Sequence, residues 1–192
     1  MVDFEVIPQM RPLFGAQERE ALNAYLDEDG FFTEFKKTAA FEAKIADYTG
    51  ASHCIVVNNG TISLTLAAIA VGVSSGDEVI VPNYTMVATP NSIKLIGATP
   101  VFVDVDPATL IMDLDLLKAA ISKKTRAIIL VLPNGRSPSC GIDKFERLSE
   151  EFGIPLIEDA AQSLGSWYPD GRHIGLAGDI GSFSFSSPKI IS

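Results

Sequence analysis

The sequence predicts a three-layer α/β fold built around a mostly parallel sheet of about six or seven strands. Short stretches rich in β-branched residues alternate with longer stretches whose apolar residues recur at helical spacing. Some strand candidates, such as residues 125–132, are apolar at nearly every position, which indicates burial on both faces of a sheet. Strands that alternate with helices are joined by right-handed crossovers, so we expect neighbouring strands to run parallel.

The expected elements follow one another without an internal repeat or a linker-like break, so we predict a single domain. After a loop-like start, two helices are expected at residues 15–30 and 38–50, and a glycine ends each of them. The strand candidates are residues 53–57, 77–82, 99–106, 125–132, 154–160 and 180–186. The helix candidates between them are residues 61–73, 85–97, 112–122 and 142–153.

Composition excludes several classes of protein. The 192 residues carry a net charge of -9, which disfavours nucleic-acid binding because that requires clustered Lys and Arg. No run of about 18 apolar residues occurs, and the N-terminal stretch lacks the pattern of a signal peptide, so we expect a cytoplasmic protein without membrane contact. The two cysteines, Cys54 and Cys140, are expected to be free thiols in a reducing compartment.

Histidine and serine patterns do not indicate hydrolytic or metal chemistry. His53 and His173 stand in no metal-binding spacing, so we expect no metal site. No GxSxG motif supports a serine hydrolase either.

A Gly-Thr pair, Gly60 and Thr61, lies between a strand candidate and a helix candidate. Free amides at a helix N-terminus, together with a threonine hydroxyl, can bind one phosphate group despite the acidic chain. The alternative is a simple N-cap, since threonine is a good capping residue.

Acidic residues end the strand candidate at residues 154–160. A carboxylate at this edge, Asp159, can hold a cationic ring nitrogen, and Gln162 can reach a neighbouring polar atom of the same ligand. The alternative is that Asp159 caps a following helix.

Lys189 follows a strand candidate in which serines and phenylalanines alternate, with Ser184 on the serine face. A partly desolvated lysine has a lowered pKa and can form a Schiff base with an aldehyde. The alternative is an ordinary exposed loop lysine.

A phosphate cradle, a strand-end carboxylate and a lysine, in this chain order, are the three groups that an aldehyde-bearing pyridine phosphate requires. The sequence resembles the DegT/DnrJ/EryC1/StrS family of sugar aminotransferases, which depend on pyridoxal 5′-phosphate (PLP) and have fold type I. The resemblance runs through nearly the whole chain, in the blocks NNGTISL, GDEVIVPNYTMVAT, GATPVFVDVD, IEDAAQSLGS and GDIGSFSFSSPK. It implies that the sheet of the large PLP-binding domain has seven strands.

The resemblance also implies roles for individual residues. Lys189 corresponds to the lysine that binds the cofactor covalently and later moves a proton between the cofactor and the substrate carbon. Asp159 corresponds to the carboxylate that keeps the pyridine nitrogen protonated, and Gln162 to the side chain near the ring 3′-oxygen. The remaining positions surround the cofactor phosphate: Gly60, Thr61 and Ser184.

Three positions depart from the family pattern. Met86 stands where an aromatic residue usually stacks on the cofactor ring, and a thioether can make a comparable contact. Leu132 replaces a frequent histidine, and Ile190 follows the lysine where asparagine is common. Since relatives that replace the lysine by histidine perform dehydration, Lys189 favours transamination.

The resemblance implies an aminotransferase that moves an amino group from L-glutamate to a nucleotide-linked keto-deoxy sugar, for example in forming a perosamine-type 4-amino sugar. We expect residues 1–192 to form the large PLP-binding domain with an N-terminal helical segment, in a homodimer whose small C-terminal domain lies outside this sequence. The alternatives are a PLP-dependent sugar dehydratase or regulatory relative, and a non-catalytic α/β binding module.

Overall fold

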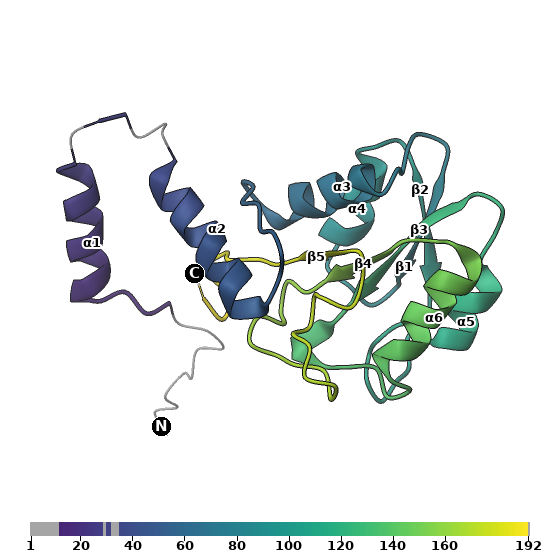
Figure 1. Ribbon diagram of the computed structural model, residues 1–192. Coiled ribbons are helices and arrows are strands. Elements are labelled where there is room, and N and C mark those ends of the chain that lie inside the picture. Colours follow the sequence, from purple (N-terminus) through teal and green to yellow (C-terminus); the bar gives the residue numbers. More distant parts are fainter. Residues whose placement is uncertain (1–11, 29, 32–34, 192) are drawn as a thin grey trace, which may run out of the picture.

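The computed structural model describes residues 12–28, 30–31 and 35–191. The loop expected at the N-terminus therefore lies mostly outside the described residues. Two helices, α1 (Ala16–Leu26) and α2 (Lys36–Thr49), precede the sheet, and α1 lies away from it (Figure 1). Helix α2 ends where predicted, at a left-handed Gly50, whereas α1 ends before the predicted Gly30.

A parallel sheet forms the centre of the fold. Its five strands have the spatial order β2-β1-β3-β4-β5, and every neighbouring pair is parallel. Because all strands point the same way, their carboxyl ends share one edge of the sheet, where ligands of such folds usually bind. The strands are β1 (Glu78–Pro82), β2 (Thr99–Val103), β3 (Thr125–Val131), β4 (Leu156–Asp159) and β5 (Ile180–Ser182).

Helices cover both faces of the sheet, so the three-layer prediction is confirmed (Figure 1). A hydrophobic core lies on each face of the sheet, and alternate residues of β3 belong to different cores. Ile128 packs with α5 and α6, and Ile129 packs with α3 and α4. This alternation explains why the strands are apolar throughout. The four covering helices are α3 (Gly60–Ala70), α4 (Ala88–Lys94), α5 (Leu114–Ala120) and α6 (Ile142–Phe152).

The predicted number of strands is wrong, because the described residues form a five-stranded sheet and not a seven-stranded one. Residues 53–57 have strand-like composition but form no ladder. These residues and β5 both line a cavity of about 800 Å³, and no ladder joins the two segments. The Val56 amide instead donates to the side chain of Glu42, and Ile55 remains 80% exposed.

The last strand is shorter than residues 180–186, because its only partner β4 ends at Asp159, which pairs with Ser182. The alternation of side chains nevertheless continues beyond the ladder. Ser182 and Ser184 both face α3, while Phe183 packs into the core on the opposite face.

The crossover from β4 to β5 contains no helix, and its backbone crosses the sheet closely. Cβ atoms at Gly178 or Gly181 would overlap main-chain atoms of Leu156 or Gly175. Buried backbone amides in such a segment need acceptors that a helix would otherwise provide.

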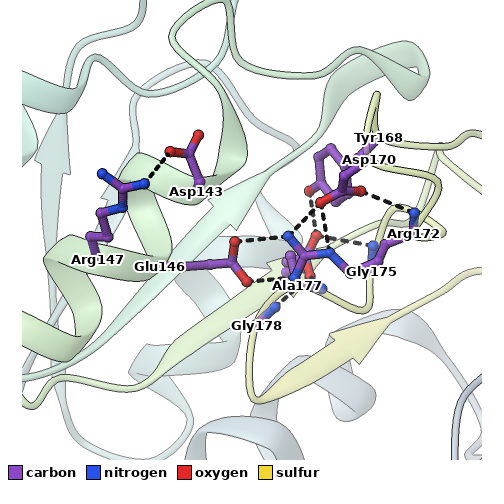
Figure 2. A network of polar contacts seen from close by, with 10 residues as sticks. Asp143, Glu146, Arg147, Tyr168, Asp170, Arg172, Gly175, Ala177 and Gly178 are labelled. Atoms are coloured by element: carbon purple, nitrogen blue, oxygen red, sulfur yellow. Dashed lines mark hydrogen bonds and ion pairs between the residues drawn. The ribbon is translucent and has the colours of Figure 1, made fainter.

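Glu158, which is fully buried, provides these acceptors, and the residues that donate to it are labelled in Figure 2. Its carboxylate accepts from the amides of Gly175 (2.9 Å), Ala177 and Gly178 (2.7 Å), and from the Tyr168 hydroxyl. Burial, together with the charge of Glu158, raises the pKa of Tyr168, so this hydroxyl keeps its proton.

The surface end of the same crossover is held by a second set of charges. Arg172 donates to both carboxylate oxygens of Glu146 on α6 and also contacts Asp170 (Figure 2). Since these groups are partly exposed, we expect them to contribute less than Glu158.

Among the described residues, no helix is both long and apolar enough to cross a membrane. Cys54 and Cys140 are free, as expected.

Replacing Glu158 with Gln should lower the free energy of unfolding by about 2–3 kcal/mol, because a buried amide group cannot accept all four hydrogen bonds. Urea unfolding measures the loss. The matched control Glu146→Gln weakens only the partly exposed contact to Arg172 and should cost about 1 kcal/mol or less. Equal losses in the two variants would contradict the assigned role of Glu158.

Candidate functional site

The N-terminus of α3 carries the two residues predicted to bind a phosphate. Asn59 is the N-cap, and its side chain accepts from the Ile62 amide at 3.0 Å. Thr61 is therefore not the cap, which removes the alternative considered for it. Within the described part of the chain, the amides of Gly60 and Thr61 and the Thr61 hydroxyl have no hydrogen-bond partner. These three donors are available to an anion.

Ser184 lies beside this helix end. A Cβ atom built on Gly60 would be 4.0 Å from the Ser184 Cβ, so the two residues are neighbours. A hydrogen bond of 2.8 Å between Ser182 on β5 and Ser63 on α3 fixes the two segments together. The structure thus adds a second hydroxyl to the donors of the helix end.

Asp159 ends β4 and is only 7% exposed. The Thr89 hydroxyl donates to its Oδ2 atom at 2.8 Å, and the Ala161 amide lies 3.3 Å from Oδ1. Burial raises the pKa of Asp159, while these two donors and the charge of Lys189 act to lower it. Turns and not a helix follow β4, so Asp159 is not a helix cap.

Lys189 is partly buried and closes a turn in which its amide donates to the Ser186 carbonyl at 2.8 Å. It lies near enough to Asp159 for its charge to act on that carboxyl. Asp159 at the end of β4 and Lys189 after β5 therefore lie at the same edge of the sheet.

Gln162 is exposed, and its position depends on a residue that the sequence did not single out. The Asn134 amide donates to the Gln162 Oε1 atom at 2.9 Å. Asn134 has φ 55°, a left-handed conformation that asparagine tolerates better than most residues. Since Oε1 already accepts this hydrogen bond, Gln162 can still donate to a ligand through its NH₂ group.

Met86 is 71% exposed and lies in the turn that enters α4, where its carbonyl accepts from the Thr89 amide at 3.0 Å. Its side chain is available to a ligand.

The arrangement combines donors for an anion, a buried carboxylate that can pair with a cationic nitrogen, and an amine near that carboxylate. These groups fit the phosphate, the ring nitrogen and the aldehyde of PLP. Two supporting residues, Thr89 and Asn134, were not predicted from the sequence. Glu158 was expected at the end of the strand with Asp159, but its contacts to the crossover were not predicted. The left-handed position of Asn134, in an Asn-Gly pair, was the one local signal available.

Two curated relatives resemble nearly the whole chain. GDP-perosamine synthases from Vibrio cholerae and Escherichia coli O157:H7 are 36% and 38% identical over 187 and 186 residues. Each alignment covers 97% of this chain and 50% of the relative. The chain therefore spans about half the length of these relatives.

Solved structures share the fold. An aminotransferase from Psychrobacter cryohalolentis gives a TM-score of 0.88 at 34% identity, over 94% of this chain and 45% of that one. A Streptococcus pneumoniae protein described as a sugar aminotransferase, in its PLP-form, gives a TM-score of 0.86 at 31% identity. The match covers 97% of this chain and 50% of that one. The GDP-4-keto-6-deoxy-D-mannose-3-dehydratase of E. coli, with bound hydrated PLP, gives a TM-score of 0.83 at 25% identity. The match covers 96% of this chain and 48% of that one.

The defining sequence pattern of one family matches residues 12–192, almost all of the chain. Together with the geometry of the sheet edge, this match shows that the chain belongs to the DegT/DnrJ/EryC1/StrS aminotransferase family.

Proposed function

We propose that this chain carries the cofactor site of a PLP-dependent aminotransferase that transfers an amino group from L-glutamate to a nucleotide-linked keto-deoxy sugar. The observation that carries the proposal is the buried Asp159 at the end of β4, together with the anion donors at the N-terminus of α3 and Ser184 beside them. The charge of Lys189 also acts on the Asp159 carboxyl. The similarity to two GDP-perosamine synthases supports a 4-keto sugar as acceptor and a perosamine-type product.

PLP supplies an aldehyde, and a ring that withdraws electrons from the carbon atom bearing the amine. Gly60, Thr61 and Ser184 hold its phosphate, and Asp159 pairs with its ring nitrogen. Gln162 donates its NH₂ group to an oxygen on the ring. Met86 packs on the ring face, where a thioether is a favourable neighbour.

Lys189 has two roles in this proposal. Its amine would form the covalent link to the aldehyde of bound PLP, and the same amine would be the group that moves a proton at the substrate carbon. Its position near Asp159 supports both roles, because it places the amine close to the group that holds the ring.

We further propose that residues 1–192 form the large domain of a longer cytoplasmic enzyme, which works as a homodimer and has a smaller C-terminal domain. The length of the relatives supports a longer chain. Leu22 and Leu26 on α1 are more than half exposed, which supports a subunit contact at this helix.

A sugar dehydratase is the second candidate, favoured by the fold shared with the E. coli 3-dehydratase. The two reactions differ in where the nitrogen of the amino donor goes, because it stays on the sugar in transamination and is released as ammonia in 3-deoxygenation. If the full-length enzyme is an aminotransferase, incubation with glutamate and GDP-4-keto-6-deoxy-D-mannose yields 2-oxoglutarate and an amino sugar in equal amounts. A 3-deoxy sugar formed together with 2-oxoglutarate and free ammonia, with no amino sugar, would indicate the dehydratase, and failure to bind PLP would exclude both.

Replacing Lys189 with Ala should abolish the visible absorbance of bound PLP and lower the transfer rate by about 10²–10⁴-fold, since one group forms the covalent link and moves the proton. Absorbance and a coupled glutamate assay on full-length protein measure the two effects. Lys123→Ala is the matched control, because Lys123 is exposed before β3. Full activity in the Lys189 variant would refute the assigned role.

Replacing Asp159 with Asn should have opposite effects on stability and on cofactor binding. Because burial raises the pKa of Asp159 in the folded state above its ordinary value, the cofactor-free wild type loses stability as the pH rises through and above that ordinary value. The Asn variant lacks this loss, so its melting temperature should exceed that of wild type at pH 7 but not at pH 4.

The same Asp159 variant should bind PLP about tenfold or more weakly, because a neutral amide does not stabilise a protonated ring nitrogen. Melting curves of cofactor-free protein and equilibrium dialysis with PLP measure these effects. An Asn variant that is less stable at pH 7 and binds PLP normally would contradict the proposal.

A further inference from the structure

Two threonine hydroxyls lie behind Asp159 and have no part in the function described so far. Thr89 is fully buried on α4, 70 residues from Asp159 in sequence, and its Oγ1 atom lies 2.8 Å from the Asp159 Oδ2 atom. Thr85, one turn earlier, places its Oγ1 atom 2.8 Å from that of Thr89. The three side chains form a continuous line of hydrogen bonds.

The direction of this line follows from the charge of Asp159. An ionised carboxylate only accepts hydrogen bonds, so Thr89 must donate its single proton to Asp159. The Thr89 oxygen then accepts, and Thr85 must donate to it. Both protons therefore point toward the carboxylate.

The contacts also distinguish the two carboxylate oxygens. Oδ2 receives the short bond from Thr89, whereas Oδ1 has only the longer contact of 3.3 Å with the Ala161 amide. Oδ1 is thus the oxygen with acceptor capacity to spare for a ring nitrogen. Because Thr89 is fully buried on a helix, it also restricts rotation of the carboxylate.

The same two threonines belong to the turn that carries Met86. The Thr89 amide donates to the Met86 carbonyl, so the turn is closed by a backbone bond and by the bond between the two hydroxyls. The line therefore joins the segment proposed to contact the ring face with the carboxylate proposed to contact the ring nitrogen.

We propose that Thr85 and Thr89 are positioning residues, which keep Asp159 ionised and orient its carboxylate toward the cofactor nitrogen through two hydroxyl donors in series. Burial opposes ionisation of Asp159, and among the described residues Lys189 is the charged group that acts on it. The hydroxyl donors add to the stabilisation by the Ala161 amide and by Lys189 without placing a second charge behind the ring. The inference rests on the proposed role of Asp159 in binding PLP.

Full-length protein, freed of cofactor and titrated with PLP, provides the main test. Thr89→Val keeps the shape of the side chain but removes the donor, so the dissociation constant of PLP should rise about tenfold. Thr89→Ser retains the hydroxyl and should stay within about twofold of wild type. Thr85→Val removes the second donor only, and we expect a rise of about threefold.

Two controls separate this role from a general effect on packing. Thr65→Val removes another buried hydroxyl, one that donates to the backbone carbonyls of Thr61 and Ser92 and does not contact Asp159. It should leave PLP binding within about twofold of wild type. In an Asp159→Asn background, Thr89→Val should have no further effect, because the two residues act through one contact.

A measurement without PLP keeps the test independent of the proposed function. Between pH 4 and pH 7, cofactor-free Thr89→Val should lose more stability than wild type, because the pKa of Asp159 rises further when its donor is removed. Thr89→Ser should follow wild type. If wild type fails to bind PLP, the proposed function is wrong, and this pH comparison still decides the role of Thr89.

The inference is overturned if Thr89→Val and Thr89→Ser change PLP binding equally, or if Thr89→Val still weakens binding when Asp159 is already Asn. Identical pH profiles for cofactor-free wild type and Thr89→Val would overturn it as well.

Discussion

Two adjacent buried carboxylates at the end of β4 hold the site together, one on each face of the sheet. Glu158 accepts hydrogen bonds from backbone amides of the crossover to β5, and Asp159 lies on the opposite face, where it accepts from Thr89. The first carboxylate determines the path of the chain toward Ser184 and Lys189. The second is the group that we propose meets the cofactor, so one strand end serves both the fold and the site.

The two carboxylates differ in how completely their hydrogen bonds are satisfied. Glu158 accepts four donors and has no capacity left, as expected of a structural group. Asp159 has one short bond and one long one, and its burial raises its pKa. A buried carboxyl with a raised pKa and acceptor capacity to spare is expected where a ligand completes the site, because the ligand can supply a further partner.

The sequence predicted the architecture well where local patterns decide it. Apolar strands alternating with helices predicted three layers and a parallel sheet, and the strand ends predicted the sheet edge at which Asp159 lies. The strand count was wrong because strand pairing is not a local property: residues 53–57 have the composition of a strand but pair with no strand of the described sheet. The roles of Thr89 and Glu158 could not be predicted, since they depend on contacts to residues distant in sequence.

The central claim is that Lys189, among all lysines of the chain, carries PLP. Reduction of PLP-loaded full-length protein with borohydride, followed by proteolysis and mass spectrometry of the peptides, tests it directly. The account predicts a pyridoxyl group on the peptide that contains Lys189 and on no other peptide. Label on a different lysine, or an unlabelled protein after saturation with PLP, would contradict it.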